Sequence, residues 1–243
     1  MSDNVRHMII NEDILLVSPH PDDVALSLEC TIRKHLLGNR CCIWNVFTKK
    51  IYNKIQLKQS EVENIVKQEE YMMWAAKKCK IIYDNFEDAQ IRLNCRVGKI
   101  VGNEAEKYQA YKENTNLVSV LNARLMEIYN QYTPKWIGIP MGIGNHIDHV
   151  LVRDMVISQI EKGIFLYEDM PYSANKLWVQ KTVDYMNKKY KISMHKIGFS
   201  HDDLHAKLKF LSIYKSQVTE RDLRLIRKYY EDNGMNEKIW IKE

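Results

Sequence analysis

Short apolar runs alternate with longer segments of helical periodicity, and this alternation limits the possible folds more than any other feature of the chain. The runs cover residues 14–18, 41–47, 81–83, 136–140 and 164–167. Short continuous runs of this kind are typical of parallel strands that are buried on both faces. Strands that alternate with helices predict a Rossmann-like, doubly wound α/β fold, in which helices cover both faces of a mainly parallel sheet.

The segments between these runs carry the predicted helices. Gly38 closes the first helix, since glycine often ends a helix in the left-handed conformation, and Pro134 follows another. The predicted helices cover 25–37, 61–80, 117–132, 148–162, 174–190, 202–215 and 219–230, and the polar stretch 93–114 is predicted to be a loop or insertion. No repeat or linker is visible, so we predict a single domain over 1–243, with its motifs in a core at about 13–217 and a C-terminal helix within 219–235.

Composition argues against several classes of protein. Hydrophobic residues make up 45% and charged residues 28% of the chain, as is ordinary for a globular domain. The net charge is +5, but the lysines and arginines are spread along the sequence, so we predict no nucleic-acid partner. No apolar run reaches the roughly 18 residues of a membrane span. A homo-oligomer is compatible with all of these features.

The cysteines indicate a reducing environment. Cys30, Cys41, Cys42, Cys79 and Cys95 contain no CxxC pair, and their number is odd. Two adjacent cysteines inside an apolar run suit free buried thiols better than a disulfide framework. The N-terminal segment 1–12 has no apolar signal core. These features favour a cytoplasmic protein.

Two polar motifs directly follow two of the predicted strands. Residues 18–23 read Ser-Pro-His-Pro-Asp-Asp, and residues 142–149 read Gly-Ile-Gly-Asn-His-Ile-Asp-His. Open α/β sheets bind ligands beyond the carboxyl ends of their strands. Histidine and carboxylate side chains ligate catalytic zinc, which keeps one coordination position for water. The motifs therefore predict a divalent-metal site with spare groups for proton transfer.

Each motif alone also has an ordinary structural explanation. The first suits a strand-to-helix turn with a capping aspartate, and the second suits a helix start with exposed histidines. The presence of both at strand ends weakens these explanations. Two other patterns that resemble functional motifs are interpreted as structural features. His201 and His205 belong to a helix entry that Ser200 caps, and Gly142-x-Gly144 lacks the third glycine of a dinucleotide-binding loop.

Further motifs follow in order along the chain. Residues 88–92 read Asp-Ala-Gln-Ile-Arg, 167–172 read Tyr-Glu-Asp-Met-Pro-Tyr, and 214–217 read Tyr-Lys-Ser-Gln. With the two motifs above, this ordered set over about residues 14–217 resembles the PIG-L (LmbE-like) family of zinc-dependent de-N-acetylases, which remove acetyl groups from amino sugars. The resemblance implies a hydrolase acting on a small molecule, namely an N-acetylated amino sugar or an N-acetylglucosamine-type conjugate.

The resemblance also implies roles for individual residues. His20, Asp23 and His149 would be the ligands of Zn²⁺, although such a site also suits other divalent ions. Asp22 would be the general base that activates the attacking water. His146 would stabilise the tetrahedral oxyanion and donate a proton to the leaving amine.

Four more residues complete the implied site. Asp148 would orient a metal-binding histidine through a hydrogen bond to the ring nitrogen that does not bind the metal. Arg92, Glu168 and Asp169 would face the pocket and bind substrate hydroxyls.

The chain departs from the family pattern at one place. Many members continue with glutamate and then a pair of glycines, whereas this chain has Val24 and, near the glycine positions, Glu29 and Cys30. We expect zinc binding to survive and the pocket shape to change. Two alternatives stay open: a metal-dependent amidase acting on a non-sugar or natural-product acylamine, and a non-catalytic sugar-binding α/β module.

Overall fold

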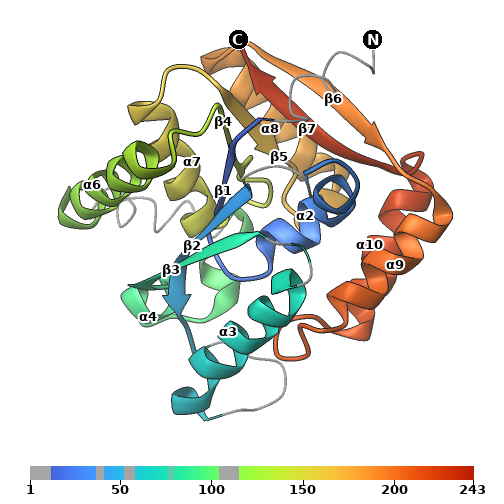
Figure 1. Cartoon of the computed structure of the whole chain (residues 1–243), viewed down its shortest axis with the longest axis horizontal. Helices are drawn as coiled ribbons and strands as arrows, with labels where there is room; N and C mark the ends of the chain where they lie inside the picture. Colours follow the sequence, from blue (N-terminus) through green and yellow to red (C-terminus); the bar gives the residue numbers. More distant parts are fainter. Residues whose placement is uncertain (1–11, 37–40, 52–57, 76, 78, 104–114) are drawn as a thin grey trace.

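One mixed sheet lies at the centre of the computed structural model, which describes residues 12–36, 41–51, 58–75, 77, 79–103 and 115–243 (Figure 1). Its strand order is β3-β2-β1-β4-β5-β7-β6. The strands from β3 to β5 are parallel, while β7 runs antiparallel to both β5 and β6. The bounds are β1 Ile14–Ser18, β2 Cys41–Lys49, β3 Lys80–Glu87, β4 Trp136–Pro140, β5 Ile164–Tyr167, β6 Ile192–Gly198 and β7 Asn236–Lys242.

The order of the parallel strands reverses beside β1. From β1 the chain builds outward through β2 to β3, and it then returns to place β4 and β5 on the other side of β1. The carboxyl ends of β1 and β4 are therefore neighbours at the point where a doubly wound sheet leaves room for a ligand. Both polar motifs begin at these two strand ends.

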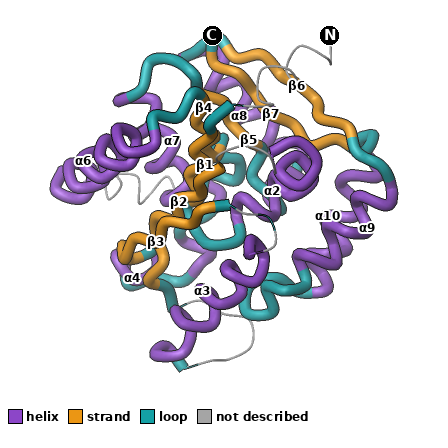
Figure 2. The backbone as a smooth tube through the Cα atoms, viewed as in Figure 1, coloured by secondary structure: helices purple, strands orange, loops and turns teal. Residues whose placement is uncertain are grey.

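Helices cover both faces of the sheet, as predicted (Figure 2). Ile14 and Leu16 of β1 pack into one core with α2, α9 and α10, whereas Leu15 and Val17 pack into a second core with α6 and α7. The alternation of side chains along a strand produces the two cores. The helices are α2 Asp23–Thr31, extended by a π-helical turn at Ile32–Leu36, α3 Gln59–Ala75, α4 Ala89–Leu93, α6 Thr115–Tyr132, α7 Ile147–Gln159, α8 Lys176–Lys189, α9 His201–Leu211 and α10 Glu220–Asp232.

The C-terminal part of the sheet differs from the prediction, because β6 and β7 were not expected. The predicted C-terminal helix within 219–235 ends at Asp232, and β7 begins at Asn236. Every residue of β6, and every residue of β7 except Glu237 and Ile239, is half-buried or exposed, so the two sequences lack the buried apolar run of the central strands.

Two other boundaries also differ. The predicted helix 61–80 ends at Ala75, and Lys80 already pairs with Cys42 in β3, which extends to Glu87 rather than to Tyr83. Strand pairing thus outweighs the helical periodicity of the last residues. In the predicted insertion 93–114, a 3₁₀ turn forms at Val97–Lys99. Residues 104–114, like Gly38, lie outside the described residues.

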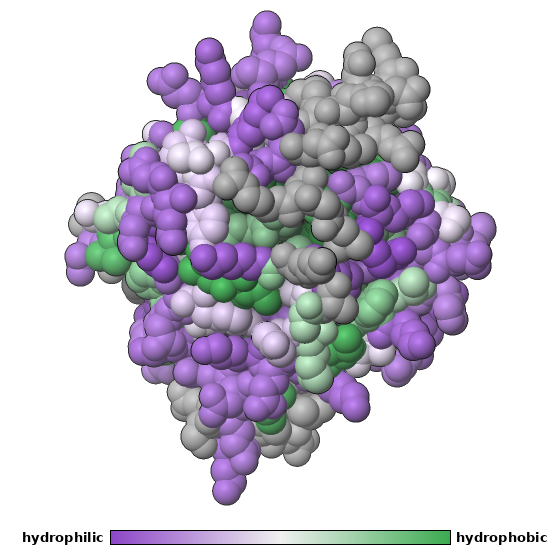
Figure 3. All heavy atoms as spheres, in the orientation of Figure 1, coloured by the Kyte–Doolittle hydropathy of each residue, from purple (hydrophilic) through white to green (hydrophobic). Residues whose placement is uncertain are grey.

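None of the described helices combines the length and the apolar character needed to cross a membrane. The face of the molecule shown in Figure 3 is mainly hydrophilic, and its apolar side chains form small separate patches. This distribution is common for proteins whose large apolar surfaces are buried in the core.

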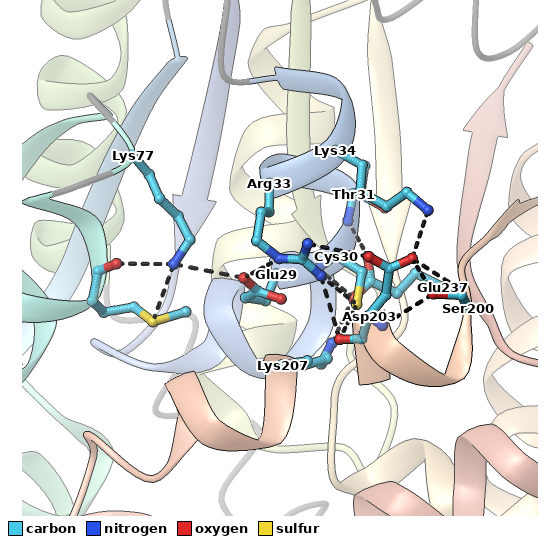
Figure 4. Close-up of polar contacts among 11 residues, drawn as sticks. Glu29, Cys30, Thr31, Arg33, Lys34, Lys77, Ser200, Asp203, Lys207 and Glu237 are labelled. Atoms are coloured by element: carbon cyan, nitrogen blue, oxygen red, sulfur yellow. Dashed lines mark hydrogen bonds and ion pairs between the residues drawn. The ribbon is translucent and has the colours of Figure 1, made fainter. Parts of the chain in front are cut away.

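Glu29 and Cys30 belong to a buried polar cluster that joins α2 to α9 and β7 (Figure 4). Glu237 of β7 accepts hydrogen bonds from the backbone nitrogens of Cys30 and Thr31, at 3.0 and 2.7 Å. The same carboxylate pairs with Lys207 of α9 at 2.5 Å, and neither side chain of this pair is exposed. Near the positions where the family pattern has glycines, polar contacts therefore hold α2 against β7 and α9.

Replacing Lys207 by methionine is expected to lower the free energy of unfolding by about 3–5 kcal/mol, because the Glu237 carboxylate then stays buried without its cation. Urea unfolding at equilibrium measures this difference. Lys228→Met is the matched control, since the ion pair of Lys228 with Asp232 is 73% and 53% exposed and such pairs contribute only about 0–1 kcal/mol. Equal decreases in the free energy of unfolding in the two variants would contradict a structural role for the buried pair.

Candidate metal centre

The first motif is a tight turn between β1 and α2. The hydroxyl of Ser18 donates to the carbonyl oxygen of His20 at 2.6 Å, and the backbone nitrogen of His20 donates to the Asp23 carboxylate at 2.8 Å. Asp22 has a φ of 109°, a conformation that favours glycine and is strained for aspartate. Strain of this kind is concentrated at functional sites, where the surroundings hold it in place.

The second motif is a glycine loop between β4 and α7. Gly142 and Gly144 have φ values of 81° and 84°, and a Cβ atom on Gly144 would lie 2.8 Å from the ring of Tyr172. Glycine is therefore required by both backbone conformation and space. His146 is the N-cap of α7, and His149 stands in its first turn, so both rings project from the start of one helix.

Ligand atoms of three side chains from the two motifs, His20, Asp23 and His149, lie within 4.8 Å of one another. The Asp23 Oδ2 atom lies 3.1 Å from Nδ1 of His20 and 3.3 Å from Nε2 of His149. Zinc–ligand bonds of about 2.0–2.1 Å at tetrahedral angles place neighbouring ligand atoms about 3.3–3.4 Å apart. The three residues are 91% or more buried, with 9%, 7% and 1% exposure. The predicted ligand trio is thus assembled, and its donor atoms fit a divalent cation.

A second carboxylate lies behind each histidine of the trio. Nε2 of His20 lies 2.9 Å from Asp148, and Nδ1 of His149 lies 2.6 Å from Asp169. Carboxylates in this position fix the ring orientation and tautomer of metal-binding histidines. They leave Nδ1 of His20 and Nε2 of His149 facing Asp23.

The residues predicted to bind substrate have other contacts in the structure. Arg92 donates to Asp148 at 2.5 Å, and Asp169 accepts from the backbone nitrogen of Ile143 at 2.9 Å as well as contacting His149. Glu168 is turned toward the C-terminal segment, where it contacts the side chains of Tyr229, Lys238 and Trp240. These contacts indicate that Arg92 and Asp169 position other side chains, and direct substrate contacts by any of the three stay predictions.

His146 is suited to donate a hydrogen bond into the site. Its Nδ1 atom accepts from the backbone nitrogen of Asp148 at 3.2 Å, so the proton of the neutral ring must be on Nε2. Burial, together with the neighbouring rings of His149 and His20, holds the pKa of His146 well below its usual value. The ring is therefore neutral near pH 7 and can offer an N–H to a developing oxyanion.

Asp22 is the carboxylate at this site that is free to take a proton. Among the described residues, no hydrogen bond or ion pair engages its side chain. Burial raises the pKa of Asp22 to about 7, and the positive charge of Lys50 opposes that rise. A base with a pKa near the working pH combines the correct ionisation state with sufficient basicity.

A cavity of about 260 Å³ opens over the trio and includes side chains that the sequence analysis did not assign to the site. Lys50 follows β2 directly, so the rule that ligands bind at strand ends would have indicated it. Gln217 belongs to the last motif, which is held in place because Ser216 donates its backbone nitrogen to Glu69 at 2.9 Å. The other lining residues are Leu26, Asp88, Gln90, Ile100, Met170, Pro171, Tyr172, Val218 and Asp222, together with the trio, Asp22 and His146.

The sequence matches the GlcNAc-PI de-N-acetylase (PIG-L) family over residues 15–160, which is more than half of the chain. The chain belongs to this family. It is accordingly an enzyme of the de-N-acetylase class, and the resemblance noted in its motifs is confirmed. No curated protein sequence matches this PIG-L family member.

Solved structures confirm the fold of this PIG-L protein. The A40926 pseudoaglycone deacetylase Dbv21 has a TM-score of 0.69 and 18% identity, covering 96% of this chain and 98% of its own. The N,N'-diacetylchitobiose deacetylase of Pyrococcus horikoshii has a TM-score of 0.59 and 17% identity, with coverage of 96% and 84%. GalB, a 4-carboxy-2-hydroxymuconate hydratase of Pseudomonas putida KT2440, has a TM-score of 0.59 and 10% identity, with 95% of each chain covered. One fold thus hosts different reactions, and the chemistry has to be argued from the site.

Replacing Asp169 by asparagine is expected to weaken zinc binding by about 10–100-fold, because the outer nitrogen of His149 loses its carboxylate partner. Competition with a chromogenic chelator measures the affinity. Glu168→Gln is the matched control, since it makes the same chemical change at the next residue, whose side chain faces Tyr229. Equal weakening by the two variants would argue against a specific role for Asp169.

Zinc binding to chelator-treated protein is expected to release at least about one proton near pH 8. Burial alone would lower the pKa of His149, but the Asp23 and Asp169 carboxylates raise it to about 10. The ring is therefore protonated below that pH and must lose its proton to ligate a metal, so the affinity should increase with pH up to about 10. Calorimetry in two buffers of different ionisation enthalpy counts the protons, and identical heats in both would contradict this expectation.

Proposed function

We propose that this protein hydrolyses the N-acetyl group of an amino sugar or an N-acetylglucosamine-type conjugate, with Zn²⁺ held by His20, Asp23 and His149. The observation that carries the proposal is the arrangement around this trio. An unpartnered carboxylate, Asp22, and a neutral ring with its proton on Nε2, His146, line the same cavity. Amide hydrolysis needs one group of each kind: a base for water and a donor for the oxyanion.

In the proposed reaction Asp22 transfers the protons and His146 stabilises the oxyanion. When bound, the zinc ion lowers the pKa of water and polarises the acetyl carbonyl. Asp22 takes a proton from the water molecule while the water oxygen attacks the carbonyl carbon. His146 donates its Nε2–H hydrogen bond to the carbonyl oxygen as that oxygen becomes negative. Asp22 then returns the proton to the amine while the C–N bond breaks. The family resemblance gives this step to His146, but the neutral ring has a single proton, on Nε2, and the oxyanion holds it.

A natural-product acylamine is the second candidate substrate. The observation that favours it is the similarity to Dbv21, a deacetylase of an antibiotic pseudoaglycone. The same residues would perform the same chemistry, so only a substrate panel separates the two candidates. We also propose a cytoplasmic site of action, which the five free cysteines support.

Replacing Asp22 by asparagine is expected to lower the rate of acetate release by about 10²–10⁴-fold, since the amide cannot take a proton from water. The assay measures acetate from a panel of N-acetylglucosamine conjugates and acylamines. Zinc content is the control, and it should match that of the wild type because Asp22 is not in the ligand trio. Equal acetate release by both proteins at equal zinc content would exclude Asp22 as the base.

A further inference from the structure

Lys50 is a buried lysine at the edge of the catalytic cavity. It follows the last residue of β2, and the backbone of the preceding Lys49 accepts a hydrogen bond from the Asp88 nitrogen at 2.9 Å. Only 5% of Lys50 is exposed, and its side chain lines the cavity together with Asp22 and Asp88. The strand β2 pairs with β1, so Lys50 and the first motif lie at the same end of adjacent strands.

The ammonium group of Lys50 lacks the partners that other buried lysines have. Lys207 pairs with Glu237 at 2.5 Å, and Lys77 lies 3.6 Å from Glu29. In the part of the chain that the structure describes, no hydrogen bond or ion pair joins the Lys50 side chain to another residue. Its charge acts on the carboxyls of Asp22 and Asp88 only at longer range, where it opposes the rise in pKa that burial causes.

A buried ammonium group without a partner is costly for a folded protein. Proteins tolerate such costs mainly at functional sites, where a ligand supplies the missing interaction. Lys50 is the one lysine or arginine among the described residues that line the cavity, and the carboxylates of Asp22, Asp88 and Asp222 line it as well. Away from the proposed Zn²⁺, an anionic group on a ligand would therefore be repelled by these carboxylates and attracted next to Lys50.

We propose that Lys50 binds an oxyanion, a carboxylate or a phosphate ester, on the acylated amine that enters this cavity. This inference rests on the proposed function and narrows its substrate class to anionic conjugates. The ammonium group forms a charge-assisted hydrogen bond with the oxyanion and holds the substrate while Asp22 and His146 act on the acetyl group. A substrate with only hydroxyl groups at that position leaves the ammonium without its counter-ion.

The test compares three glycosides of N-acetylglucosamine, carrying methyl, carboxymethyl and phosphoethyl groups, with the zinc-loaded full-length protein. The wild type is expected to prefer at least one anionic glycoside by about tenfold or more in kcat/KM, mainly through KM. Lys50→Met should abolish this preference, bringing the ratio of kcat/KM between the anionic and the methyl glycosides to about one. Lys50→Arg should retain the preference, and Lys49→Met, which removes the same charge from the adjacent residue, should match the wild type.

Thermal unfolding separates ligand recognition from a structural role. Lys50→Met is expected to unfold at the same temperature as the wild type or at a higher one, because the variant removes a buried charge that has no partner. A lower unfolding temperature would overturn the proposal. Equal loss of activity toward neutral and anionic glycosides would also overturn it, since Lys50 would then serve the reaction itself.

Binding measurements keep this inference distinct from the proposed function. Asp22→Asn, which should bind without hydrolysis, is titrated with the same glycosides by calorimetry, alone and combined with Lys50→Met. Lys50-dependent binding of an anionic glycoside without hydrolysis by the wild type would support the role of Lys50 and contradict the deacetylase proposal. Hydrolysis of all three glycosides with equal kcat/KM would support the deacetylase proposal and contradict the role of Lys50.

Discussion

The buried carboxylate of Asp148 is the interaction on which the rest of the site depends. It stands in the first turn of α7 with no exposed surface, and it joins three segments that are distant in sequence. It contacts His20 of the first motif at 2.9 Å, pairs with Arg92 at 2.5 Å, and accepts from the backbone nitrogen of Ala89 at 2.9 Å. Burial alone would raise the pKa of Asp148, but Arg92 and His20 hold it well below its usual range, so the carboxylate is charged. Because its geometry decides which nitrogen of His20 faces Asp23, the ligand trio exists only when all three segments are in place.

The strand order of the sheet alone brings two of these segments, the first motif and the start of α7, close together. The reversal of strand order places the ends of β1 and β4 side by side, and a helix follows each end after a turn or a short loop. Asp23 is the first residue of α2, and a carboxylate is favoured at a helix N-terminus by the helix dipole. His146 and His149 begin α7 in the same way, on one face of the helix. The candidate metal centre is thus the meeting point of two helix starts, which explains why its residues come in two short motifs.

The same geometry explains which parts of the site were predictable from sequence. The central strands could be predicted because they are buried on both faces, and the close approach of His20, Asp23 and His149 could be predicted because the two motifs follow the neighbouring strands β1 and β4. The side chains of Glu168 and Asp169 could not be assigned in this way. Successive residues at a strand end point to opposite faces, so Asp169 reaches His149 while Glu168 turns to Tyr229. A motif shows that both residues occur after β5, but only the sheet's packing shows which one faces the metal centre. The strands β6 and β7 were missed for a different reason, since they are mostly half-buried or exposed and polar residues take up about half of each.

The departure from the family pattern at Glu29 and Cys30 affects a different part of the molecule from the one that performs the chemistry. Both residues are buried, yet neither lines the cavity. The Glu29 carboxylate contacts Arg33 and Lys77, and the backbone nitrogen of Cys30 donates to Glu237 of β7. Glycines would let helices approach closely, whereas here an ion pair and backbone hydrogen bonds to Glu237 fill the same interface. No hydrogen bond or ion pair of Glu29 or Cys30 with a described residue reaches the side chains of the ligand trio or its supporting carboxylates. Differences in substrate must come from the cavity wall instead, where Lys50, Asp88 and Asp222 supply the charges that a ligand meets first.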